Sequence, residues 1–60
     1  MASKKILKLA IQQLQIKNKQ LKEQQKNATS KAEKMQINKQ IASNNSMILD
    51  YEFRYEQEND

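Results

Sequence analysis

The side chains of this sequence that could do chemistry form one acidic and one basic group. The acidic group lies near the C-terminus and comprises Asp50, Glu52, Glu56 and Glu58. Paired carboxylates can act as general acid and general base, or they can hold a hard cation through oxygen atoms. Both tasks need a concave and partly dry site, which a pair of packed helices does not provide. We therefore interpret the acidic group as a solvated tail.

The basic group is a row of lysines in the N-terminal half of the chain. Its members would share one helix face: Lys4, Lys5, Lys8, Lys19, Lys22 and Lys26. Such a row can follow nucleic-acid phosphates in a salt-sensitive manner with little regard to base sequence, because Lys is a point charge and bidentate base recognition favours Arg. No aromatic residue lies among these lysines, so stacking on single-stranded bases is not expected. The alternative is a solvated charged face, which is commoner on helices.

The residue types on which most enzymes depend are missing. The sequence contains no His, the usual proton shuttle, and no Cys, the most reactive nucleophile. Disulfides and thiolate metal sites are excluded, so any metal ligand would be an oxygen atom. The sequence therefore predicts a protein that is not an enzyme, and it indicates no cofactor, no metal and no small-molecule substrate.

The elements that must position these residues are two long helices. An apolar residue recurs at every seventh position, and the sequence has no Gly and no Pro: Leu7, Leu14, Leu21, Ala28, Met35, Ala42 and Leu49. This repeat predicts helix. Ser3 can cap a first helix over residues 3–27, because its hydroxyl accepts bonds from terminal amides. Ser30 and Glu33 match the capping-box pattern, which predicts a second helix over residues 31–56.

The joint between the two helices would be three or four residues long, which forces them to be antiparallel neighbours. We therefore predict one all-α domain over residues 1–60, an antiparallel helical hairpin with a frayed acidic tail at residues 57–60. Without Gly, a left-handed residue closing the first helix would have to be Asn27 or a residue for which that conformation is costlier. The poor helix formers at residues 43–46 mark a weak point, although the apolar spacing keeps its phase through them.

A single unbroken helix is the alternative fold, because the seven-residue repeat continues through Ala28. The positions three residues after each member of this repeat are almost all polar: Ala10, Lys17, Gln24, Lys31, Asn38, Asn45 and Glu52. A coiled-coil seam needs two apolar columns, so the sequence favours the hairpin.

Apolar positions on the two predicted helices indicate where they make contact. One face of the first helix carries Ile6, Leu7, Ala10, Ile11, Leu14 and Leu21, interrupted by Lys17 and Asn18. Spacings of four and three, typical of a coiled coil, connect Ile37, Ile41, Asn44, Ile48, Tyr51 and Tyr55 in the second. We predict a protein interface at Leu7, Ile11, Leu14, Leu21, Ile37, Ile41, Ile48, Tyr51 and Tyr55.

Each predicted helix also carries apolar residues on its other side. These are Leu9 and Ile16 in the first helix and Met35, Ala42, Leu49 and Phe53 in the second. Two apolar faces on one helix favour a bundle of at least three helices, and so short a chain gains stability by oligomerising. The expected partner is a copy of the chain itself or a larger protein assembly.

Charge is divided unevenly along the chain. All ten lysines lie in residues 1–42 with only Glu23 and Glu33, whereas residues 43–60 hold five acidic residues and Arg54. An antiparallel hairpin brings the basic start of the first helix beside the acidic end of the second, which offsets unfavourable interactions with the helix dipoles. Exposed ion pairs contribute only about 0 to 1 kcal/mol each, so they orient the helices rather than hold them together.

These patterns predict a small helical binding protein that acts through helix–helix contacts as a regulatory, adaptor or structural-accessory protein. A nucleic-acid-binding regulator that uses the lysine row is the alternative. No segment approaches the roughly 20 apolar residues that span a bilayer, and no Trp anchors a helix on its surface, so we do not expect a membrane partner. The lack of Cys fits the cytoplasm, and the excess of Lys over Arg fits a gene from a bacterium of low GC content, its phage or a plasmid.

Overall fold

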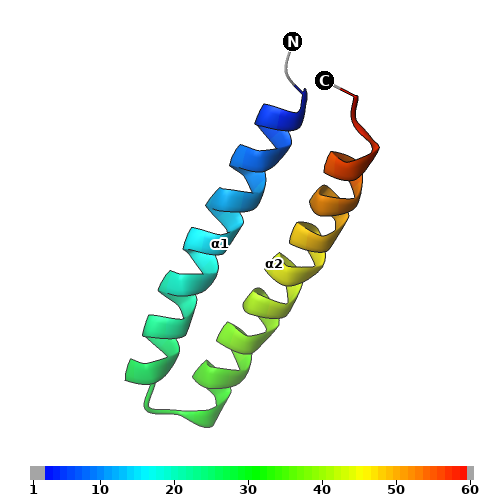
Figure 1. Cartoon of the computed structure of the whole chain (residues 1–60). Helices are drawn as coiled ribbons and strands as arrows, with labels where there is room; N and C mark the ends of the chain where they lie inside the picture. Colours follow the sequence, from blue (N-terminus) through cyan, green and yellow to red (C-terminus); the bar gives the residue numbers. More distant parts are fainter. Residues whose placement is uncertain (1–2, 60) are drawn as a thin grey trace.

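The computed structural model describes residues 3–59, which form two antiparallel α-helices, α1 (Ser3–Asn27) and α2 (Lys31–Gln57). The start of α1 and the end of α2 lie at the same end of the molecule, and the connecting turn lies at the other (Figure 1). The Cα atoms extend over 46 × 14 × 11 Å, so the hairpin is a narrow rod. This arrangement confirms the predicted all-α hairpin and rules out the single unbroken helix.

The turn over residues 28–30 relies on side-chain capping rather than on a left-handed residue. The hydroxyl of Ser30 accepts a hydrogen bond of 3.1 Å from the backbone N–H of Glu33, which satisfies an amide that the first turn of α2 leaves unpaired. At the end of α1, the N–H of Ala28 donates to the carbonyl of Gln25 over 3.3 Å. No described residue has a positive φ, so α1 ends without a left-handed closing residue.

Helix α2 continues through residues 43–46 without a break. Asn44 is half-buried and donates a hydrogen bond from its side-chain amide to Asn18 on α1, so a tertiary contact supports this weak helical segment. The helix ends at Gln57, one residue beyond the predicted end, and the N–H of Glu58 caps it by donating to the carbonyl of Tyr55. Of the predicted frayed tail, residues 57–59 are described and Asp60 lies outside the described residues.

The core of the hairpin is a thin seam between α1 and α2. Only two apolar side chains in residues 3–59 are buried, Leu14 at 9% exposed and Ile37 at 8%, together with the polar Asn18 at 8%. No side chain in this range is completely enclosed. One layer of contacts between two helices therefore holds the fold, and most of the apolar surface outside it stays wet.

Candidate interaction surface

The nine residues predicted to form a protein interface all lie along the seam between α1 and α2. Leu14 and Ile37 are buried, and the other seven are half-buried: Leu7, Ile11, Leu21, Ile41, Ile48, Tyr51 and Tyr55. In the folded hairpin these side chains pack helix against helix within the chain. A surface for a partner must therefore be sought on the outer sides of α1 and α2.

A cluster of three asparagines interrupts the seam near the middle of the rod. The side-chain amide of Asn18 donates to the Oδ1 of Asn45 over 2.8 Å, and Asn44 donates to the Oδ1 of Asn18 over 3.0 Å. The burial of Asn18 therefore comes with hydrogen bonds to both of its neighbours on α2. Because this pairing fits one alignment of the helices, we expect the cluster to set their register at some cost in stability.

A second polar link lies nearer the turn, and the sequence analysis missed it. The Nε2 of Gln25 donates to the Oδ1 of Asn38 over 2.6 Å and also reaches the carbonyl of Lys34 over 3.4 Å. Gln25 lies seven residues after Asn18 and fourteen after Ile11, a column that follows Leu7, Leu14 and Leu21 at an offset of four. A helix places residues four positions apart on the same side, so this offset of four from the leucines was the sequence signal that could have identified Gln25 as a contact residue.

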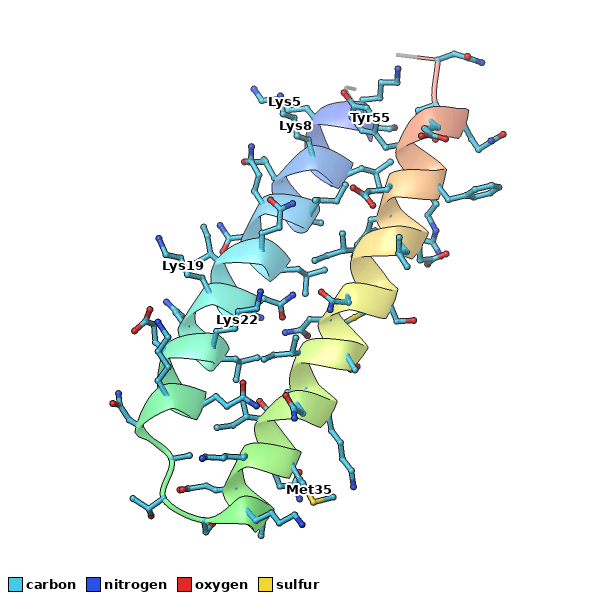
Figure 2. All side chains as sticks on the ribbon, turned by 60° about the horizontal axis from the view of Figure 1, so that its bottom comes forward. Lys5, Lys8, Lys19, Lys22, Met35 and Tyr55 are labelled. Carbon is cyan, nitrogen blue, oxygen red and sulfur yellow. The ribbon has the colours of Figure 1, made fainter. Side chains whose placement is uncertain are left out.

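The most apolar surface left open is a stripe along the outer side of α2. We call this the outer stripe and define it by Met35, Ala42, Leu49 and Phe53. Met35 is 52% exposed, Leu49 67% and Phe53 64%, and Ala42 is also exposed. Met35 projects from α2 on the side away from α1 (Figure 2). The outer stripe therefore lies outside the buried seam, although Phe53 also lines a surface hollow together with Ile6 and Leu7 of α1.

Exposed apolar residues on α1 are fewer and more scattered. Leu9 and Ile16, each 51% exposed, lie on its outer side as predicted from the helical period. Ile6 was assigned to the main face, but it is 55% exposed and that assignment was wrong. The reason is that Ile6 lies about 100° around the helix from Leu7, which occupies the seam.

The lysine row lies along α1 and is mostly open to solvent. Lys5, Lys8, Lys19, Lys22 and Lys26 are exposed. Lys5 and Lys19 point away from α2 (Figure 2). Lys4 is half-buried, with its Nζ 5.1 Å from the centre of the Tyr55 ring, and Lys26 lies 3.9 Å from Glu23 in an exposed ion pair. The row therefore keeps most of its charge on one accessible surface.

The acidic group lies at the open end of the hairpin. Asp50, Glu52 and Glu56 are exposed and Glu58 is half-buried, and Asp50 pairs with Arg54 over 3.2 Å on the same helix. A surface hollow of about 420 Å³ is lined by Lys8, Ile11, Glu52, Tyr55 and Glu56, so the basic start of α1 does lie beside acidic residues of α2. Within residues 3–59, no three acidic side chains gather closely enough to hold a metal ion.

These features define the class of the protein as an all-α helical hairpin with an uncovered apolar stripe. No protein-family model matches the chain, and no curated protein or solved structure matches it significantly. Neither described helix combines the length and apolar character that crossing a membrane requires.

Proposed function

We propose that this chain is a small non-catalytic binding protein that works in the cytoplasm and docks on another protein through helix–helix contacts. The observation that carries the proposal is the outer stripe, where three large apolar side chains are more than half exposed on a helix whose other side already packs in the seam. A helix apolar on two sides is stable in water when both sides are covered. Such a protein acts as a regulator, an adaptor or an accessory to a larger structure.

Cross-linking in the host cell tests this proposal. A photoreactive phenylalanine analogue placed at Leu49 should yield a discrete cross-linked protein, because Leu49 is the most exposed of the large apolar side chains in the outer stripe. The same analogue at Gln20, exposed on α1, serves as the matched control and should yield none. The Leu49 product should also disappear when Met35 and Phe53 are both replaced by Lys. The absence of any discrete product from Leu49 would reject the proposal.

Nucleic-acid binding is the second candidate function, and the five exposed lysines of the lysine row on α1 favour it. From Lys5 to Lys26 the row extends over about 32 Å of helix, long enough to follow several phosphates. Binding of this kind would be strongest at low salt and would weaken steeply as salt is added, because it releases counterions.

Titration with duplex and single-stranded RNA and DNA at low and moderate salt tests the second candidate. Replacing Lys19 and Lys26 by Glu should weaken binding at low salt by roughly tenfold or more, because each phosphate contact adds to the affinity. Replacing Lys17 and Lys39 by Glu changes the net charge equally but outside the row, so that pair is the matched control. If the unaltered chain binds no nucleic acid at low salt, this function is excluded.

A further inference from the structure

We infer that the partner covering the outer stripe is a second copy of this chain, with α2 packed antiparallel against α2 of the partner subunit. This inference rests on the proposed function and names the occupant of the same surface. The amount of exposed surface, the distribution of charge and the order of side chains along the stripe each support it.

The first argument is the surface area of the hairpin. Its accessible surface is 4908 Å², with a chain mass of 7.1 kDa. A compact monomer of this mass exposes about 4,100 Å², so the hairpin exposes about 800 Å² more. Each partner in a standard-sized protein interface buries about 800 Å². The excess is therefore enough for one stable interface of ordinary size.

The second argument is charge complementarity along α2. Residues 31–42 contain three lysines and Glu33, a net charge of +2. Residues 43–59 contain four acidic residues and Arg54, a net charge of −3. An antiparallel pair of α2 helices places each basic half against the acidic half of the other copy, whereas a parallel pair places like charges together. A second copy thus supplies the charge pattern that this surface requires.

The third argument is the order of side chains on the outer stripe. Large residues lie at the two ends of the stripe, and between them lie the small Ala42 and, beside the stripe on the same side of α2, the exposed Ser46. A two-fold axis between Ala42 and Ser46 brings the helices close at their small residues and sets Met35 against Phe53 of the partner subunit, a favourable sulfur–aromatic pairing. The exposed large apolar residues of α1 are Leu9 and Ile16 on its outer side and Ile6 about 100° around the helix from Leu7, so they do not form one stripe comparable with that of α2.

Sedimentation equilibrium measures the proposed dimer directly. The unaltered chain should sediment at twice its mass of 7.1 kDa, and its mass should fall on dilution. Replacing both Leu49 and Phe53 by Lys should raise the dimer dissociation constant at least about a hundredfold. Replacing both Leu9 and Ile16 by Lys is the matched control, an equally drastic change at two exposed residues of α1, and should leave the dimer intact. Circular dichroism should show that both variants remain helical.

Cysteine cross-linking tests the orientation without disturbing the fold, because the chain has no cysteine of its own. Under mild oxidation, a mixture of the Met35→Cys and Phe53→Cys variants should form a disulfide between the two. Neither variant alone should do so, because in an antiparallel pair the two copies of residue 35 lie about 27 Å apart. Efficient cross-linking of Met35→Cys alone would overturn the antiparallel arrangement.

The results also separate failure of this inference from failure of the proposed function. A folded chain that stays monomeric at high concentration overturns the dimer, and so does a dimer that the Leu49 and Phe53 substitutions leave unchanged. If the analogue at Leu49 then cross-links to a different protein in the cell, the proposed function stands with another partner. If it cross-links to nothing, both fail.

Discussion

Replacing Leu14 by Asp should unfold the hairpin at room temperature. Leu14 is one of only two buried apolar side chains in the described part of the chain, and it lies near the middle of the seam. Removing a buried leucine side chain costs about 2 to 5 kcal/mol, and a charge left in the seam adds to that cost. A core in a domain this small supplies only about 3 to 5 kcal/mol in total. Far-ultraviolet circular dichroism should therefore show the loss of most of the helix signal.

The matched control for this experiment is Gln15→Asp. Gln15 is the next residue of α1 and is exposed, so the variant receives the same new side chain outside the seam. It should change the free energy of unfolding by less than about 1 kcal/mol, in line with most surface substitutions. A helix signal that survives Leu14→Asp unchanged would contradict the assignment of the seam as the core of the fold.

Replacing Asn18 and Asn44 together by Leu should make the hairpin more stable. These side chains hydrogen-bond to each other across the seam, and Asn18 is almost fully buried. The double replacement removes the two polar side chains that lie in the seam and adds apolar burial, as at polar positions of coiled coils, while the exposed Asn45 can hydrogen-bond to water instead. We expect a gain of about 1 to 2 kcal/mol, which raises the melting temperature by roughly 5 to 15 °C in a domain of this size.

The single variant Asn18→Ala provides the contrast. It leaves Asn44 and Asn45 without their shared partner and opens a gap in the seam, so it should lower the free energy of unfolding by about 1 to 3 kcal/mol. Thermal melts of the two variants should therefore shift in opposite directions. A double variant that melts below the unaltered chain would show that the asparagine cluster stabilises the fold rather than only setting its register.

The local sequence signals predicted α2 well. The alternation of four and three from Ile37 to Tyr55 identified every apolar residue that α2 contributes to the seam, because a helix apolar on one side shows its period directly. The pairing of Ser30 and Glu33 located the start of α2 because it describes a local bond between the capping residue and the first turn of the same helix.

The contacts of α1 were harder to predict because they depend on tertiary structure. Beside Leu7, Leu14 and Leu21 a second column can follow at an offset of three or four, and only packing decides which column faces α2. The structure places Ile11, Asn18 and Gln25 in the seam, whereas Lys17 and Gln24 are exposed. Asn18 was recognised as an interruption of the seam, but the asparagines that satisfy it lie 26 and 27 residues away, beyond the reach of any local pattern.

The candidate site was also predictable only in part, because which side of α2 is covered depends on tertiary structure. The sequence showed two apolar sides on α2 without showing which one the chain covers by itself. The nine residues first assigned to an interface have the stronger repeat, and the hairpin uses that repeat for its own seam. The outer stripe became the candidate surface once α1 was seen to cover the opposite side of α2.

The placement of both helix ends at one end of the rod makes the hairpin suited to grafting. Ser3 and Glu58 line one common hollow there, so the two points of attachment are close together. Inserted into a surface loop of an unrelated carrier, the hairpin would stand out as a stiff arm about as long as its 46 Å extent, with the turn at its tip. An epitope inserted beside Thr29 would then be displayed at a known distance from the carrier.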